Sequence, residues 1–316
     1  MGPTSLGPNT RHMMRHILDL FELTTAEIER IFALTDELKT KYTHGLREPL
    51  FSGRVMALLF EKPSLRTRVS FEAAMTHLGG STMFLGDDVG WGQRESMADF
   101  GRVISQYVDV IVCRANAHHK VTELARFATC PVVNGLTDKS HPCQALADLY
   151  TLRETHGTLH GLKLAYVGDA NNVARSLAAA CGKLGVKFAI ASPVGYQFDG
   201  AFVSQLKKEV PQLDLLQTAD PESAVRDAHG VYTDVWTSMG QESERAARKQ
   251  AFAPYQVNAA LMQLAPPKSI FLHCLPARRG EEVTDEVIDG PQSAVIPQAA
   301  NRMHAQKGLL AWLLSS

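Results

Sequence analysis

VMALLFEKPSLRTRVSFEAAM, residues 55–75, is the stretch that decides the fold of this chain of 316 residues. Six consecutive apolar residues (55–60) precede a Pro-Ser pair, and from Phe71 onward apolar residues recur at helical spacing. An unbroken apolar run followed by an amphipathic helix is typical of a buried parallel strand and its crossover helix. Ser64 stands where a helix N-cap is expected. The stretch therefore predicts one strand–helix unit of an α/β fold.

The same alternation of apolar runs and helical patterns continues toward both ends of the chain. Upstream, helical spacing begins at Thr25, with Thr24 or Thr25 as the N-cap. Further strands are expected at 81–85, 109–113, 163–167, 186–191, 213–217, 230–235 and 269–275, and helices near 66–78, 96–107, 173–184 and 200–209. This rhythm predicts two α/β domains, each a parallel β-sheet flanked by helices.

The expected boundaries follow from the segments that interrupt this rhythm. Residues 1–13 are rich in Gly, Pro, Ser and Thr without a period and predict a disordered tail. HPCQALADLYTLRETHG (141–157) predicts a connecting helix that ends at Gly157. We expect a first domain over 14–150, a second over 151–301, and a C-terminal helix over 302–316 that packs back on the first domain.

The composition excludes several functional classes. Lys plus Arg total 32 and Asp plus Glu total 33, so the chain has no overall basic charge to attract nucleic acid or anionic membranes. No apolar stretch approaches the length of a membrane span or signal peptide, which favours a cytoplasmic protein. The five cysteines form no Cys-x-x-Cys pair, and no His/Cys/Asp/Glu grouping has metal-site spacing. We predict no metal.

The segment Ser64–Arg68 is a candidate anion site. A helix N-terminus offers backbone N–H groups and a partial positive charge, and Arg66 and Arg68 can add charge-assisted hydrogen bonds to a phosphate. The alternative from these residues alone is a capped surface helix with two solvated arginines.

Residues 64–68, Ser-Leu-Arg-Thr-Arg, resemble the Ser-Thr-Arg-Thr-Arg phosphate-binding motif of the aspartate/ornithine carbamoyltransferase family. His141-Pro142-Cys143-Gln144 resembles the family's His-Pro-x-Gln segment, and the resemblance extends from about Met14 to the C-terminus. Leu65 replaces the motif's usual Thr, and Gly90 stands where family members often carry a Gln that reaches a neighbouring subunit; Gln93 or Arg94 are candidate substitutes. By resemblance, the carbamoyl phosphate site comprises Ser64, Leu65, Arg66, Thr67, Arg114, His141, Gln144, Cys274, Leu275 and Arg302.

The second half of the chain contains a candidate acceptor site. Gly168-Asp169-Ala170-Asn171-Asn172 follows an apolar run but lacks the second and third glycines of a dinucleotide-binding turn, which argues against a nicotinamide enzyme. Asp234 followed by Ser238-Met239-Gly240 resembles the family's ornithine-binding loop, and His273-Cys274-Leu275-Pro276 its cysteine motif. By resemblance, Asn172, Asp234, Ser238 and Met239 bind ornithine, and Arg114, His141, Asp234 and Cys274 are catalytic.

The resemblance implies transfer of the carbamoyl group of carbamoyl phosphate to the side-chain amine of L-ornithine, within arginine biosynthesis, without a cofactor. It also implies a homotrimer or a multiple of trimers. Carbamoyltransferases for aspartate, putrescine or N-acylated ornithine are the nearest alternatives, followed by a dinucleotide-dependent oxidoreductase and a non-catalytic anion-binding protein. The sequence distinguishes neither the biosynthetic from the degradative direction nor a trimer from a larger assembly.

Overall fold

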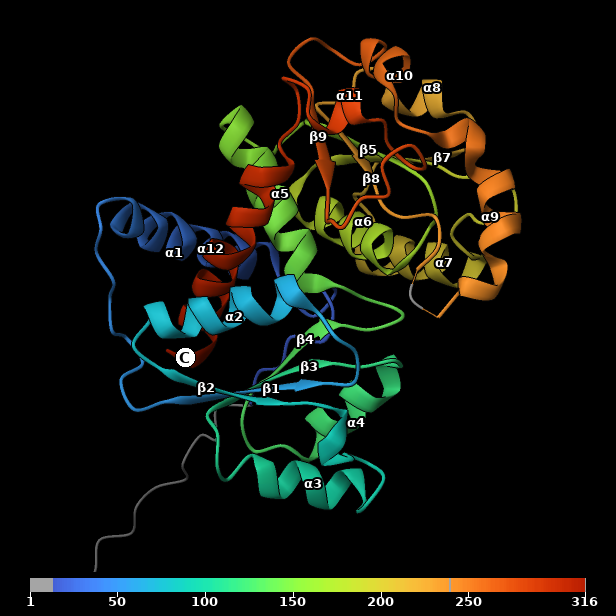
Figure 1. Ribbon diagram of the computed structural model, residues 1–316. Helices are drawn as coiled ribbons and strands as arrows, with labels where there is room; N and C mark the ends of the chain where they lie inside the picture. Colours follow the sequence, from blue (N-terminus) through green and yellow to red (C-terminus); the bar gives the residue numbers. More distant parts are fainter. Residues whose placement is uncertain (1–13, 239, 316) are drawn as a thin grey trace, which may run out of the picture.

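The computed structural model describes residues 14–238 and 240–315, in which two parallel sheets are each covered by helices on both faces (Figure 1). The first sheet has the order β2-β1-β3-β4, with β1 at Val55–Phe60, β2 at Ser81–Leu85, β3 at Val110–Arg114 and β4 at Val132–Leu136. The second has the order β7-β6-β5-β8-β9, with β5 at Lys163–Val167, β6 at Lys187–Ala191, β7 at Leu215–Thr218, β8 at Gly230–Thr233 and β9 at Ile270–His273. The predicted fold class is confirmed. Residues 1–13, predicted as a tail, lie outside the described residues.

The helices of the first domain lie on the two faces of its sheet according to the alternation of strand side chains. Met56, Leu58 and Phe60 of β1 face the core formed with α1 (Thr25–Thr43), α2 (Leu65–His77), α5 (Pro142–His156) and α12 (Val295–Leu314). Ala57 and Leu59 face the opposite core, with α3 (Met97–Ile104) and α4 (His118–Phe127). Because both faces are covered, the central strands β1 and β3 are apolar throughout except for Arg114 at the end of β3.

The second sheet is covered in the same way. Tyr166 and Phe188 face α6 (Asn172–Leu184) and α7 (Gly200–Glu209). On the other face, Val167 and Phe271 pack with α8 (Pro221–Val225), α9 (Arg245–Phe252), α10 (Ala259–Gln263) and α11 (Asp285–Ile288). Short 3-10 helices η1 (Asp87–Val89), η2 (Glu242–Glu244) and η3 (Ala253–Tyr255) lie in the connecting loops.

Two long helices connect the domains. α5 ends as predicted, at a Gly157 cap in the left-handed region with φ of 80°. α12 starts against β9 and then packs on α5, α1 and α2, which confirms that the C-terminal helix returns to the first domain (Figure 1). It begins at Val295, earlier than the expected 302, because Pro297 falls in the first turn, where a backbone N–H has no intrahelical acceptor. Among the described residues no helix has the length and apolar character to span a bilayer.

β4 and α4 were not predicted from the sequence. Asn134-Gly135 inside β4 is ordinarily a turn signal. In the fold, the Asn134 side chain is buried and donates a 2.8 Å hydrogen bond to the Leu18 carbonyl. A Cβ on Gly135 would lie 3.3 Å from the Cys113 carbonyl oxygen, so the small residue allows close strand approach. Tertiary packing therefore overrides the local turn preference.

Candidate active site

One cavity of about 1280 Å³ lies between the two domains and is lined by residues of both. Arg68, which the sequence suggested as a phosphate contact, does not line this cavity, because its guanidinium pairs with Glu72 at 3.0 Å and stacks on the Phe84 ring. Every described residue that the resemblance assigns to a substrate site does line it, and Met239 lies outside the described residues. The lining residues among them are Ser64, Leu65, Arg66, Thr67, Arg114, His141, Gln144, Asn172, Asp234, Ser238, Cys274, Leu275 and Arg302.

Strand order explains why these side chains meet. In the first sheet the order reverses between β1 and β3, and in the second between β5 and β8. Loops that leave neighbouring strands in opposite directions open a crevice at such a switch point, beyond the carboxyl ends of the strands. Ser64 follows β1 and Arg114 ends β3, whereas Asn171 follows β5 and Asp234 follows β8. Each half of the cavity is therefore the switch-point crevice of one sheet.

The first domain forms the half of the cavity that the resemblance assigns to carbamoyl phosphate, the donor of the transferred group. This donor half begins at the N-terminus of α2. Ser64 is the N-cap as expected, with its hydroxyl accepting a hydrogen bond from the Thr67 backbone N–H at 3.3 Å. No acidic residue occupies the first turn of α2. The partial positive charge of the helix end is therefore not neutralised by its own sequence, which favours an anion.

Two buried arginines converge on the same helix turn. Arg114 Nη1 donates to Thr67 Oγ1 at 3.3 Å, and Arg302 Nη2 donates to the same oxygen at 3.1 Å. Arg302 also donates to Gln144 Oε1, and its Nη2 lies 3.4 Å from His141 Nε2. Arg302 on α12 therefore places its guanidinium beside residues that come from α2, β3 and α5.

The charges of the donor half repel one another. Burial, followed by the nearby Arg302 and Arg66, lowers the pKa of Arg114 to about 10. Burial, followed by the nearby Arg302 and Arg114, lowers the pKa of His141 well below its usual value, so its ring is neutral at physiological pH. A bound dianion would relieve this repulsion, and a neutral His141 can still donate one hydrogen bond.

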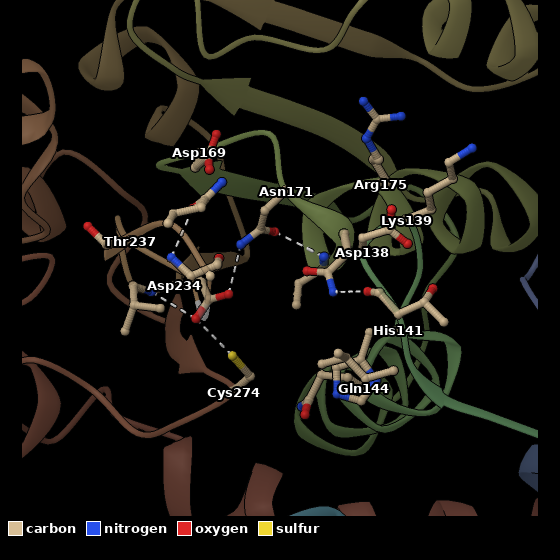
Figure 2. A pocket seen from close by; sticks show the side chains of 18 of the residues that line it. Asp138, Lys139, His141, Gln144, Asp169, Asn171, Arg175, Asp234, Thr237 and Cys274 are labelled. Carbon is tan, nitrogen blue, oxygen red and sulfur yellow. Dashed lines mark hydrogen bonds between the residues drawn. The ribbon is translucent and has the colours of Figure 1, made fainter. Parts of the chain in front are cut away.

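The second domain forms the half of the cavity that the resemblance assigns to the amine that accepts the transferred group. This acceptor half is centred on a carboxylate. Asp234 Oδ1 accepts hydrogen bonds from the Cys274 thiol at 3.1 Å and from the Val235 backbone N–H at 2.8 Å. Asp234 Oδ2 accepts from Asn171 Nδ2 at 2.9 Å. Figure 2 shows Cys274 and Asn171 pointing at Asp234 from two sides. Burial and Asp234 raise the pKa of the Cys274 thiol, which is therefore protonated at neutral pH.

The remaining expected residues line the acceptor half or its border. Asn172 Nδ2 donates to the Thr137 carbonyl of the first domain at 2.6 Å, and the Ser238 backbone N–H donates to Gln241 Oε1 at 3.0 Å. Leu275 has φ of 57°, an uncommon value for a non-glycine residue, and its N–H donates to His273 Nδ1 at 2.8 Å. Sequence reasoning missed Asn171; its place as the N-cap of α6, beside the expected Asn172, was the available signal.

Asp234, His273 and Cys274 also bring three potential metal-ligating atoms within 4.8 Å of one another. Their positions in the chain could not have indicated this, since they come from the ends of two strands. His273 Nδ1 accepts the Leu275 N–H and its Nε2 lies 3.2 Å from Glu282 Oε1, so both ring nitrogens already have hydrogen-bond partners. The expectation of no metal remains a prediction.

Comparison with protein families also divides the chain into two parts, with most of α12 inside the second match. Residues 15–154 match the family described as aspartate/ornithine carbamoyltransferase, carbamoyl-P binding domain. Residues 160–313 match the description aspartate/ornithine carbamoyltransferase, Asp/Orn binding domain.

Individual relatives resemble the chain over nearly its whole length. An ornithine carbamoyltransferase from Anoxybacillus flavithermus is 52% identical over 303 residues, covering 95% of this chain and 96% of that protein. One from Bacillus subtilis is 51% identical, with coverages of 95% and 94%. The solved structure of ornithine carbamoyltransferase from Pyrococcus furiosus has a TM-score of 0.92 at 47% identity, covering 96% of this chain and 97% of that one.

Proposed function

The chain belongs to the aspartate/ornithine carbamoyltransferase family, and we propose that its cleft transfers the carbamoyl group of carbamoyl phosphate to the side-chain amine of L-ornithine. The products are L-citrulline and phosphate. The observation that carries this proposal is the pairing of a cationic donor half with a carboxylate-centred acceptor half in one cavity. The first suits an acyl phosphate, and the second suits an amino acid that presents an ammonium group.

In the donor half, carbamoyl phosphate binds with its phosphate at the start of α2. Ser64, Leu65, Arg66 and Thr67 hold the phosphate, helped by the helix end and its arginines. Arg114, His141 and Thr67 lie beside the carbonyl oxygen and stabilise the oxyanion that forms on attack. Gln144 holds the amide end through its oxygen, and Arg302, which can only donate, contacts carbamoyl phosphate beside it, with Cys274 and Leu275 closing the site from the second domain.

In the acceptor half, Asp234, Ser238, Met239 and Asn172 hold the amino-acid end of ornithine. The side-chain amine, with an ordinary pKa of about 10.4 for a lysine-like group, must lose its proton before attack. The buried cations of the donor half disfavour a further positive charge and so favour the neutral amine. The amine attacks the carbamoyl carbon and a tetrahedral intermediate forms. The bond from carbon to the phosphate oxygen then breaks, and the second proton of the attacking nitrogen passes to the departing phosphate. No cofactor takes part.

The test is citrulline formation with matched acceptors. Initial rates with ornithine, putrescine, N-acetylornithine and aspartate should rank ornithine first. Putrescine lacks the carboxylate, and a site built to bind a missing group can reject the analogue by about 10⁴-fold. Another acceptor in first place would refute the proposed specificity, and phosphate binding without turnover would refute the enzyme.

We propose a donor domain over residues 14–150 together with 302–316, and an acceptor domain over 151–301. The two family matches, 15–154 and 160–313, support a boundary in this region. Expressing 14–157 with a separately supplied α12 peptide tests it: the donor domain should fold only with the peptide, because α12 contributes Leu309 and Leu310 to its core.

We also propose a homotrimer or a multiple of trimers. An exposed apolar surface supports self-association: Leu65 and Val69 lie one turn apart on α2, and Phe84 lies on the edge strand β2 with its ring on the side of the sheet that α2 covers. The Arg68 guanidinium, 3.8 Å from the Phe84 ring centre, joins the two elements. Light scattering should give a multiple of three times 34.6 kDa.

We also propose that the protein acts in the cytoplasm, in arginine biosynthesis. All five cysteines carry free thiols, as suits a reducing compartment. A relative from Pyrococcus furiosus, 48% identical, is named an anabolic ornithine carbamoyltransferase. Growth of an arginine auxotroph lacking this activity should be restored by the gene for this chain.

A further inference from the structure

A bridge of buried polar side chains runs behind the cavity from Gln144 to the backbone of His273. Gln144 Nε2 donates to Asp148 Oδ1 at 2.7 Å, and Gln298 Nε2 donates to the same oxygen at 2.6 Å. At its other end, Gln298 Oε1 accepts the His273 backbone N–H at 2.9 Å. Asp148 lies on α5 and Gln298 on α12, the two helices that connect the domains.

Only one set of donors and acceptors is compatible with this bridge. A backbone N–H can only donate, so the atom of Gln298 that faces His273 is its oxygen and its amino group faces Asp148. Arg302 also can only donate, so the oxygen of Gln144 faces Arg302 and its amino group faces Asp148. Asp148 Oδ1 therefore accepts both amides, and neither amide can flip without losing a partner.

The bridge ends at groups of opposite halves of the active site. Gln144 lines the donor half, and His273 directly precedes Cys274 of the acceptor half. Asp148 and Gln298 are 0% and 1% exposed and do not line the cavity, so they touch no substrate.

Burial of this carboxylate opposes folding. Apolar residues in the same place could pack the α5–α12 seam, and replacing buried charged groups by apolar ones is often neutral or stabilising. Apolar contacts are not directional, however, so they would not set the position of the Gln144 amide relative to the end of β9. Carbamoyl transfer needs such alignment, because misplacement of reacting groups by about 1 Å can reduce a rate about 100-fold.

We propose that Asp148 and Gln298 are positioning residues for the transfer reaction, and that their bridge holds Gln144 of the donor half in register with Cys274 of the acceptor half. The proposal rests on the proposed function, because it assigns the bridge a role in joining that reaction's two substrates. The bridge acts on the alignment of bound substrates and leaves the phosphate-binding turn of α2 unaltered.

Substitutions that break the bridge should lower kcat more than they change substrate binding. Gln298→Leu removes both hydrogen bonds, and Gln298→Glu sets a second carboxylate against Asp148. Each should reduce kcat at least about tenfold while the KM for carbamoyl phosphate stays within about threefold. Asn301→Leu is the matched control: Asn301 is also buried in the α5–α12 seam, where it donates to Thr151 Oγ1 and Glu154 Oε2, but it does not reach β9. It should lower Tm and leave kcat within about threefold.

The double variant Asp148→Leu/Gln298→Leu completes a double-mutant cycle with the two single variants. Both substitutions remove the same hydrogen bond between Gln298 Nε2 and Asp148 Oδ1. The losses in kcat should therefore be non-additive, with the double variant within about threefold of the weaker single variant, as expected for contacting residues. The bridge has no positioning role if Gln298→Leu keeps kcat within twofold of wild type, or if kcat in all variants simply follows Tm. Failure of the wild type to make citrulline would instead refute the proposed function.

Discussion

The two halves of the cavity occupy equivalent places in their sheets yet carry opposite charge. Each lies where strand order reverses, between β1 and β3 or between β5 and β8. The donor half presents Arg66, Arg114 and Arg302, whereas the acceptor half centres on Asp234. Chain topology therefore selects the place of a binding crevice, and the few side chains at strand ends select what binds there.

The halves also differ in how complete their hydrogen bonding is. Asp234 already accepts three hydrogen bonds from its own domain. In the donor half, Arg114 Nε and Arg302 Nε are buried without a partner among the described residues, and the pKa of Arg114 is lowered. An anion bound in the donor half would therefore stabilise it by pairing with these arginines. In the acceptor half the Asp234 carboxylate already has hydrogen-bond partners, so a bound ammonium group would have to replace or share some of them.

The largest effect should come from removing a donor-half charge. Arg66→Ala loses a charge-assisted contact where leaving-group charge grows, so kcat/KM should fall about 1000-fold, roughly 4 kcal/mol. Arg68→Ala is the control, because Arg68 lies on the same helix but stacks on Phe84, is paired with Glu72 and does not line the cavity. Citrulline initial rates measure both. If kcat/KM fell by the same small factor in both variants, Arg66 would have no larger role in the reaction than the surface residue Arg68.

Behind the donor half, Asp148 should make stability depend on pH. Burial raises its pKa from 3.8 to about 6, so the folded chain binds this proton at higher pH than the unfolded chain does. The stabilisation is present below about pH 4 and is lost as pH rises through about 6, amounting to roughly 3 kcal/mol. Urea unfolding from pH 4.5 to 7.5 should therefore show a smaller fall in the unfolding free energy for Asp148→Asn than for wild type.

Asp199→Asn is the matched control for that series. Hydrogen bonds from the Phe202 N–H and Arg175 lower the pKa of the Asp199 carboxyl, so its contribution has the opposite sign and is lost as pH falls. If the unfolding free energy of Asp148→Asn changed with pH as steeply as that of the wild type, Asp148 would not be a buried carboxylate that titrates in this pH range.

In the acceptor half, Asp234→Asn should raise the KM for ornithine and lower kcat/KM about 100-fold, roughly 2.7 kcal/mol. The KM for carbamoyl phosphate should stay within about threefold, because the donor half is intact. Full steady-state kinetics with each substrate varied in turn separate the two halves. A larger change for carbamoyl phosphate than for ornithine would reverse the assignment of the halves.

The smallest effect is expected for Cys274→Ser, a nearly isosteric change. The thiol donates to Asp234 beside the reacting groups, so kcat/KM for ornithine should fall about tenfold while Tm changes by only a few degrees. Thermal melts and the pH dependence of kcat on one preparation test this. An unchanged pH profile and KM would make Cys274 an inert packing residue.

Much of the fold could be predicted because its signals are local. The apolar runs of β1, β3, β5 and β9 and the caps at Ser64 and Gly157 lie in short windows of sequence. β4 was missed because its Asn-Gly pair carries the opposite local signal, and only burial against β3 and Leu18 makes it a strand. Asp148 and Gln298 were missed because a buried polar residue on a helix has no distinguishing pattern in the chain.

By itself, the sequence determined the two strand–helix domains and, through the family resemblance, indicated candidate residues for each half-site. Hydrophobic period, capping and short motifs depend on neighbours within a few positions, so they can be read along the chain. Only the tertiary structure decided that Arg302 would reach Thr67, 235 positions away, and that one carboxylate would receive amides from both α5 and α12. Such contacts depend on the packing of the whole chain, because the hydrogen bonds of a buried polar group are set by distant elements that exclude water around it.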